Sequence, residues 1–228
     1  QYACNGIYGN MGEVCNAGSR ILVQKSVFDE FVAKFAEAAA KIVVGAGSDE
    51  TSEMGPLITK AHQKKVLDFI ASGQAEGAKL LVGGEAYSDA RRIGNFVQPT
   101  AFVGAPLGSR IVREEIFGPV AVLIPFEDEE EAVRLANDTP YGLSGAVFTS
   151  DGGRAQRVIR RIRAGVTWIN AFHFTFNEAP WGGYKQSGFG RELGGAGAVV
   201  SWPTRPAILV RLTPIGWHGY SSLAALSS

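Results

Sequence analysis

An almost unbroken apolar run at residues 120–126 constrains the fold of this chain more than any other segment. It reads Val-Ala-Val-Leu-Ile-Pro-Phe, with no alternation between apolar and polar side chains. A strand of this kind needs cover on both of its faces, which is typical of a parallel sheet with helices packed on it. The run therefore predicts a strand that is buried on both faces.

Strand-like and helix-like segments alternate around this run. Apolar residues recur at helical spacing in four segments, and short apolar stretches predict strands between them. The expected helices cover residues 28–42, 59–72, 128–136 and 154–163, and the expected further strands cover 21–23, 80–82, 96–103, 145–148 and 166–170. This order predicts an α/β fold, a parallel sheet with helices on both faces. Ligands of such sheets bind outside the carboxyl ends of the strands.

The end of the chain has a different character. Residues 202–228 contain three prolines, one strand-like stretch at 207–212 and a tail of small residues. A strand without neighbours has unpaired backbone groups and needs to pair with the edge of another sheet. We therefore expect one domain over 1–201 and, over 202–228, an arm whose strand joins copies of the chain into a homo-oligomer.

Composition excludes several classes of function. Lys and Arg total 22, Asp and Glu also total 22, and the formal net charge of zero gives no electrostatic footprint for nucleic acid or an anionic membrane. The apolar runs are much shorter than the roughly 20 residues of a membrane span, and the first ten residues do not resemble a signal peptide. Two cysteines and three scattered histidines form no metal-ligand pattern and no disulfide scaffold. We expect a cytoplasmic protein that contacts neither nucleic acid nor membrane and holds no metal.

Cys15 is the candidate nucleophile. It lies in the segment 12–19, which reads Gly-Glu-Val-Cys-Asn-Ala-Gly-Ser. Small residues on both sides allow the backbone to approach a reacting carbon closely, which a catalytic thiolate needs. The alternative from composition alone is an ordinary buried cysteine. Cys4, which lacks such surroundings, is interpreted as structural.

Two further segments carry candidate site residues. Residues 114–119 read Glu-Glu-Ile-Phe-Gly-Pro and directly precede the apolar run, while residues 180–188 read Pro-Trp-Gly-Gly-Tyr-Lys-Gln-Ser-Gly. Taken alone, the glutamates fit a solvated helix end, and Phe117 and Trp181 fit a hydrophobic core. His62 has two lysines close after it in a predicted helix, and we expect it to be simply exposed.

Together, the three segments resemble the aldehyde dehydrogenase superfamily, in the family order and over about residues 6–194. The resemblance implies that Cys15 is the catalytic nucleophile and that NAD or NADP is the cofactor. It implies that Glu115 accepts hydrogen bonds from the nicotinamide ribose and that Phe117 packs near the nicotinamide ring. It also implies that Trp181, Phe172 and His173 line the substrate tunnel.

The resemblance further implies that an aldehyde is oxidised to a carboxylic acid through a cysteine thiohemiacetal and a thioester. In this family the general-base glutamate, the oxyanion asparagine and the cofactor-binding domain all precede the nucleophile. We therefore expect the chain to be the catalytic domain and arm of a longer protein, inactive by itself. Residues 178–188 and the late Gly216-Trp217 pair are most similar to the betaine-aldehyde and amino-aldehyde group, although Gly9 stands where the family usually has an aromatic residue.

Two other functions remain open at this point. An activated Cys15 could be acylated by esters without any nucleotide, which would make the chain a thiol esterase. The strand at 207–212 could instead make the chain a non-catalytic assembly module.

Overall fold

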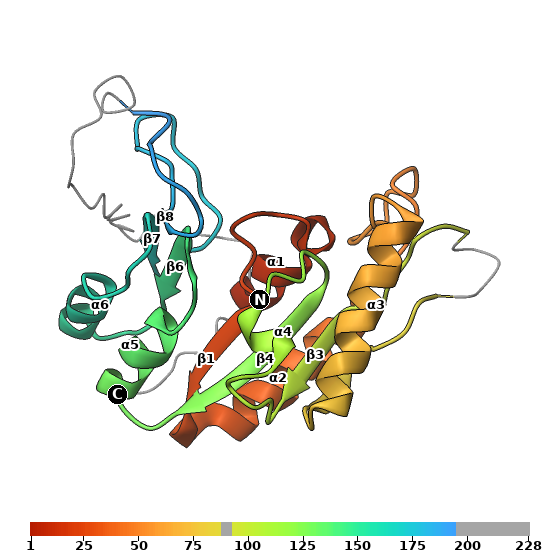
Figure 1. The fold of residues 1–228 in the computed structure, drawn as a ribbon, viewed down its shortest axis with the longest axis horizontal. Coiled ribbons are helices and arrows are strands. Elements are labelled where there is room, and N and C mark those ends of the chain that lie inside the picture. The colour runs from red at the N-terminus through yellow and green to blue at the C-terminus, as the bar shows by residue number, and fades with distance from the viewer. Residues whose placement is uncertain (88–92, 195–228) are drawn as a thin grey trace, which may run out of the picture. The chain divides into compact units, whose positions relative to one another are not determined.

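The computed structural model describes residues 1–87 and 93–194, and the chain divides into two compact units that are described separately (Figure 1). The units are Gln1–Asp128 and Glu129–Ser228. The first contains α1 (Tyr2–Tyr8), the 3-10 turns Gly9–Gly12 and Lys25–Val27, β1 (Arg20–Gln24), α2 (Phe28–Ala40), α3 (Lys60–Ala75), β2 (Lys79–Val82), β3 (Thr100–Val103), α4 (Arg110–Arg113) and β4 (Val120–Phe126). The second contains α5 (Glu129–Asn137), β5 (Tyr141–Gly142), β6 (Ser144–Val147), α6 (Gly152–Ile159), β7 (Val166–Ile169) and β8 (Tyr184–Lys185). The predicted arm at 202–228 lies outside the described residues.

The first unit is built on a four-stranded sheet with the order β1-β4-β3-β2. Strand β4 spans the predicted residues and runs parallel to both of its neighbours, with Leu22 beside Ile124 and Phe102 beside Val122. Every residue from Val120 to Ile124 is at most 5% exposed. The prediction of a strand buried on both faces is therefore confirmed.

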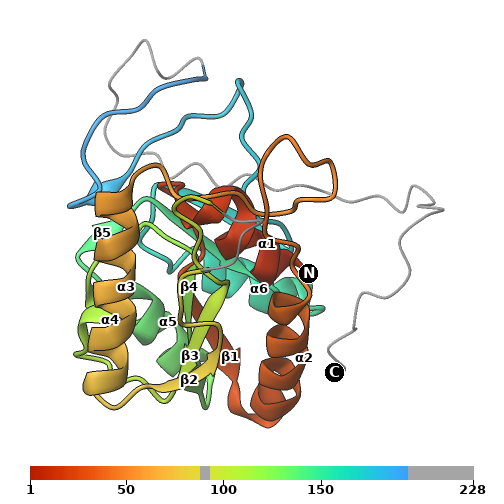
Figure 2. The same cartoon turned by 90° about the vertical axis from the view of Figure 1, so that its right-hand side faces the viewer.

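Helices cover both faces of this sheet. Ala121 and Leu123 of β4 belong to a core that also contains Ile7 of α1 and Phe35 of α2. Because successive side chains of a strand point to opposite faces, Val122 lies on the other face. Figure 2 shows α2 on one side of the strands and α3 with α4 on the other. The predicted α/β fold with helices on both faces is confirmed.

One strand differs from the expected parallel arrangement. Strand β2 pairs antiparallel with β3, and the register shifts between Leu80 and Val82. Strand β3 also begins at Thr100 rather than at residue 96. Residue 99 is a proline, which has no N–H to donate, and the segment before it pairs separately through an Ala86–Val97 bridge.

The second unit contains a parallel pair, β6 and β7, and a short antiparallel pair, β5 and β8. Helix α6 begins after Asp151, whose Oδ1 accepts a hydrogen bond from the Arg154 backbone N–H at 2.9 Å. An aspartate in this place caps the helix and suits the positive end of its dipole. The predicted helix at 154–163 is therefore present, but it lies slightly earlier in the chain.

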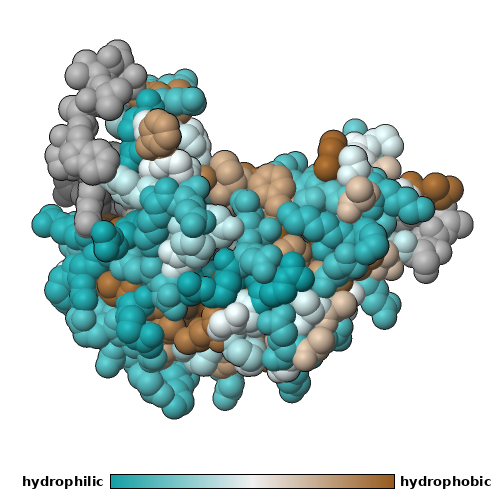
Figure 3. Space-filling model, in the orientation of Figure 1, coloured by the Kyte–Doolittle hydropathy of each residue, from teal (hydrophilic) through white to brown (hydrophobic). Residues whose placement is uncertain are grey.

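The surface drawn in Figure 3 is mostly hydrophilic, and hydrophobic groups show on it as small separate areas. Some large apolar side chains are nevertheless open to solvent, with Ile58 at 77% and Phe189 at 100% exposure. Within residues 1–87 and 93–194, no helix is long and apolar enough to cross a membrane.

Candidate active site

Cys15 lies at the tip of a turn in the first unit. The backbone N–H of Ala17 donates to the carbonyl of Val14 at 2.9 Å, and the N–H of Gly18 donates to the carbonyl of Gly6 at 2.8 Å. The Cys15 thiol is free and exposed. Cys4 is buried, and burial raises the pKa of its thiol. Of the two cysteines, only Cys15 is both open to solvent and held on a fixed turn.

The backbone before this turn has an unusual path. Asn10, Met11 and Gly12 all have positive φ, at 48°, 56° and 69°. A Cβ added at Gly12 would overlap the carbonyl oxygen of Gly118. Position 12 therefore needs glycine for its conformation and for the close approach of a second backbone. The loop that carries Cys15 consequently lies in direct contact with the loop at 114–119.

The second loop presents the two cofactor candidates to solvent. Glu115 and Phe117 are exposed, and Ile116 between them is buried at 4%. Phe117 has a φ of 60°, an unfavourable conformation for an aromatic residue. An exposed carboxylate can accept hydrogen bonds from two hydroxyls, and an exposed ring beside it offers an apolar face. The residues present therefore fit a ribose diol joined to a flat ring.

Helix α3 supports this second loop. The Nε2 atom of His62 lies 2.7 Å from the carbonyl oxygen of Phe117, and the Nζ atom of Lys65 lies 3.5 Å from that of Glu115. A Cβ added at Gly118 would lie 2.6 Å from Cγ2 of Val66. The first two turns of α3 thus contact the loop at Glu115, Phe117 and Gly118.

The expectation that His62 is simply exposed is wrong. Its side chain is 16% exposed and also lies 3.4 Å from Oε1 of Glu13, a carboxylate that is itself 9% exposed. The neighbouring lysines suggested a solvated helix face. Helical spacing predicts the burial of His62 better, because His62 lies four residues before the fully buried Val66 and therefore shares its helix face.

The substrate candidates gather in the second unit. The Trp168 ring is fully buried and packs edge-on against Phe172, with centroids 5.2 Å apart. It also packs against Trp181 in a tilted arrangement, with centroids 6.4 Å apart. The Phe172 and His173 rings lie 4.6 Å apart. The Trp168 indole N–H donates to the carbonyl of Phe174 at 3.0 Å, which satisfies its polar atom. All three predicted substrate residues are half-buried members of one aromatic group.

Backbone pairing holds Trp181 within this group. Its N–H donates to the Glu192 carbonyl and its carbonyl accepts from the Glu192 N–H, both at 2.7 Å. The next residue, Gly182, lies so close to Gly165 that a Cβ at Gly165 would overlap its carbonyl. In the part of the chain that the structure describes, no group of three His, Cys, Asp or Glu side chains could hold a metal ion.

Comparison with known proteins identifies the family of this chain. The model of the aldehyde dehydrogenase family matches residues 1–201. The chain belongs to the aldehyde dehydrogenase family. The betaine aldehyde dehydrogenase of Bacillus subtilis is 47% identical over 196 residues, which are 86% of this chain and 40% of that protein. An aldehyde dehydrogenase of Enchytraeus buchholzi is 46% identical over 189 residues, 82% of this chain and 37% of its own length.

Solved structures of this family share the fold of the chain. A crystal structure of betaine aldehyde dehydrogenase from Staphylococcus aureus in complex with NAD+ matches with a TM-score of 0.84 and 48% identity. The match covers 86% of this chain and 39% of that one. The chain therefore spans about two fifths of the length of the relatives that it matches.

Proposed function

We propose that the protein to which this chain belongs oxidises an aldehyde to a carboxylic acid with NAD or NADP, and that Cys15 is its nucleophile. The observation that carries this proposal is the placement of Cys15, exposed at the tip of a turn whose loop contacts the Glu115–Phe117 loop. A dehydrogenase of this kind needs its nucleophile and its cofactor-binding groups on adjoining segments, because both act on one carbon atom.

The chemistry begins at the Cys15 sulfur. Its thiolate forms a bond to the aldehyde carbon, and the carbonyl oxygen takes up the negative charge of the adduct. We propose that the Cys15 backbone N–H donates a hydrogen bond to this oxygen. A bound nicotinamide cofactor supplies the hydride acceptor. Loss of hydride from the adduct leaves a thioester on Cys15, which water hydrolyses to the acid and the free thiol.

Glu115 and Phe117 are the proposed cofactor residues. Glu115 would accept hydrogen bonds from the ribose hydroxyls, and Phe117 would pack beside the nicotinamide ring. The NAD+ complex of the Staphylococcus aureus relative supports NAD as the cofactor. Replacing Glu115 by glutamine would leave one acceptor oxygen and remove the negative charge. We therefore expect Glu115→Gln to raise the KM for NAD.

The substrate proposed for this protein is betaine aldehyde or an amino aldehyde. Betaine aldehyde dehydrogenases are prominent among the relatives, and the aromatic group around Trp168 offers Trp181 and Phe172 as walls. A quaternary ammonium group is attracted to the face of such rings.

A chimera tests the proposal. The part of the Bacillus subtilis relative that precedes its nucleophile motif is joined to this chain, and NADH formation from betaine aldehyde is followed by absorbance. We expect steady NADH formation that Cys15→Ser abolishes and that Cys4→Ala, the matched control, retains. We also expect the 228-residue chain alone to produce none, since it spans about two fifths of its relatives. NADH formation that survives Cys15→Ser would contradict the proposal.

Thiol esterase activity is a second candidate, because the Cys15 thiol is free and exposed without any nucleotide. Hydrolysis of 4-nitrophenyl acetate by the chain, lost on Cys15→Ser, would support it.

We further propose that the protein is cytoplasmic and forms a homo-oligomer through the strand at 207–212, which lies outside the described residues. An assembly role without catalysis would show as a tight oligomer with an unreactive Cys15.

A further inference from the structure

One imidazole N–H lies between two oxygen atoms from two different loops. The Nε2 atom of His62 is 2.7 Å from the carbonyl oxygen of Phe117 and 3.4 Å from Oε1 of Glu13. A carbonyl oxygen can only accept a hydrogen bond, so Nε2 must carry the proton whether the ring is neutral or charged. The contact therefore fixes the tautomer of neutral His62 with its proton on Nε2.

Glu13 is held at several points, although it precedes the exposed Cys15 by only two residues. Its Oε1 accepts a hydrogen bond from the backbone N–H of Ile58 at 3.2 Å, just before α3 begins. Its backbone N–H donates to the carbonyl of Asn10, and its carbonyl accepts from Nδ2 of Asn10 at 3.0 Å. Both the side chain and the backbone of Glu13 therefore have defined positions.

Phe117 needs such support from its neighbours. A positive φ persists at a residue of this type only when the surrounding structure holds it. The His62 ring packs edge-on against the Phe117 ring, with centroids 6.2 Å apart and planes at 74°, in addition to the hydrogen bond to its carbonyl. His62 thus contacts the Phe117 backbone and side chain together.

We propose that His62 is a positioning residue that joins the nucleophile loop to the cofactor loop. Its Nε2–H, shared between the Phe117 carbonyl and the Glu13 carboxylate, holds Phe117 in its positive-φ conformation and sets the distance between the two loops. The proposal rests on the proposed function, because that function makes the relative position of Cys15 and the Glu115–Phe117 loop matter. The contacts of His62 themselves lie within this chain and can be measured without substrate or cofactor.

Three variants of the 228-residue chain separate this role from simple packing. His62→Leu fills space but has no N–H, whereas His62→Gln places an amide N–H near the position of Nε2. Lys64→Ala is the control, since Lys64 lies in the same turn of α3 and pairs with the exposed Asp68. Hydrogen exchange by mass spectrometry follows peptides over 12–18 and 114–119, and iodoacetamide alkylation follows Cys15.

We expect His62→Leu to speed exchange in both loops by about five- to tenfold, the scale of one lost hydrogen bond. We also expect it to change the Cys15 alkylation rate by at least about twofold, by the same loss. His62→Gln should restore both, and Lys64→Ala should change neither. Nitrogen-15 NMR of His62 in the unaltered chain should show the proton of the neutral ring on Nε2.

A neutral ring with its proton on Nδ1 would overturn the proposal. An effect of His62→Leu that stays confined to one loop, or a failure of His62→Gln to restore exchange, would overturn it equally. None of these measurements uses an aldehyde or NAD. A failed oxidation assay therefore leaves them intact, and a failed exchange experiment leaves the proposed oxidation intact.

Discussion

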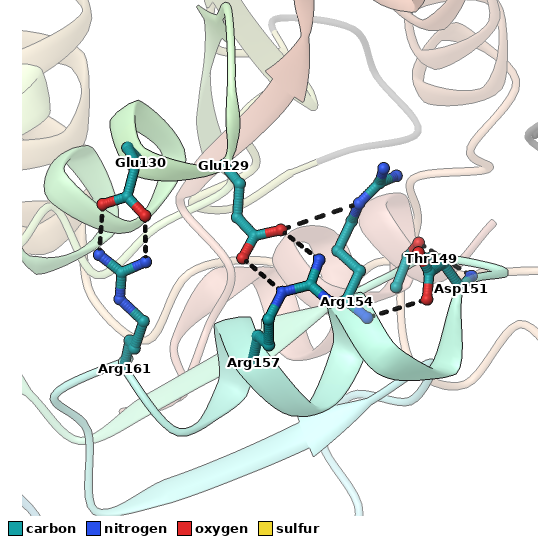
Figure 4. A network of polar contacts seen from close by, with 7 residues as sticks. All are labelled: Glu129, Glu130, Thr149, Asp151, Arg154, Arg157 and Arg161. Atoms are coloured by element: carbon teal, nitrogen blue, oxygen red, sulfur yellow. Dashed lines mark hydrogen bonds and ion pairs between the residues drawn. The ribbon is translucent and has the colours of Figure 1, made fainter.

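The two units of the chain join neighbouring segments in different ways. In the first unit, the Cys15 loop and the Glu115–Phe117 loop meet at a backbone contact where only glycine fits, above a sheet whose central strand is sealed from water. In the second unit, ion pairs join α5 to α6 and to the turn that directly follows α6 (Figure 4). A close fit of two backbones defines the first contact, whereas charged side chains bridge the second on the surface.

The ion pairs of the second unit are well aligned but exposed. Arg157 donates to both carboxylate oxygens of Glu129, at 3.2 and 2.9 Å, and Arg161 donates to both oxygens of Glu130. Arg154 approaches Glu129 as well, at 3.9 Å. Pairs in solvent contribute little net stability and are screened by salt. We therefore expect the contact between the first-unit loops to be insensitive to salt and easily disrupted by substitution. The α5–α6 contact should be weakened by salt, and substitutions there should change stability little.

The largest effect should come from the buried strand of the first unit. Leu123→Ala removes a side chain that is 0% exposed, and the lost burial plus the cavity should lower the free energy of unfolding by about 2–5 kcal/mol. Urea denaturation followed by circular dichroism measures it. Leu107→Ala, at a position that is 39% exposed, is the control and should change stability far less. Equal effects at the two positions would break the comparison.

A smaller loss of stability should follow Gly12→Ala. The new Cβ would meet the Gly118 carbonyl in a positive-φ conformation, and such strain costs on the order of 1–3 kcal/mol. Gly9→Ala is the matched control, because Gly9 has a φ of −54° and a Cβ there meets nothing within 4 Å. Urea denaturation compares the two variants. A stable, unchanged Gly12→Ala chain would show that the loops do not need this contact.

In the second unit, Arg161→Gln should give only a small change, and one that depends on salt. The substitution removes the bidentate pair with Glu130, whose Coulomb attraction is already weakened by water. Denaturation of Arg161→Gln, Glu130→Gln and the double variant, each at low salt and at about 1 M salt, isolates the pair by a double-mutant cycle. A coupling that survives in high salt would mean that the pair is not screened.

The smallest effect should appear as a dependence on pH. The hydrogen bond from Arg157 lowers the pKa of Glu129, and the one from Arg161 lowers the pKa of Glu130. A lowered pKa in the folded state means that the unfolded state binds the proton more readily. The contribution is therefore present above the unfolded value of about 4.3 and is lost as the pH falls through the lower folded value. Denaturation between pH 3 and 7, with Glu129→Gln as reference, measures this slope.

Much of the fold could be predicted from the sequence, because burial leaves a direct pattern. The apolar run at 120–126 became β4 with its expected bounds, and the helix predicted from residue 59 is capped by the Thr59 side chain. The direction of β2 could not be predicted, because a strand of four residues has the same apolar pattern in either direction. The division of the chain at Asp128 also left no signal in its composition.

The residues of the candidate site could be predicted from the sequence, but the contacts that support their loops could not. Cys15, Glu115 and Phe117 stand out by their motifs, and the structure places the loops that carry them in contact. The support from His62 depends on a tertiary contact between α3 and a loop 55 residues further along the chain, which local spacing does not reveal. The sequence places Glu13 two residues before Cys15, and only the structure shows its largely buried carboxylate beside His62.

Acylation of Cys15 measures whether its thiol is reactive in the folded chain. The folded chain is treated with 4-nitrophenyl acetate, and mass spectrometry locates the acetyl group. We expect rapid acetylation of Cys15 while Cys4 stays unmodified until the chain unfolds, because Cys15 is exposed on its turn and the pKa of the buried Cys4 thiol is raised. A Cys15 that reacts only upon unfolding, together with Cys4, would contradict the account.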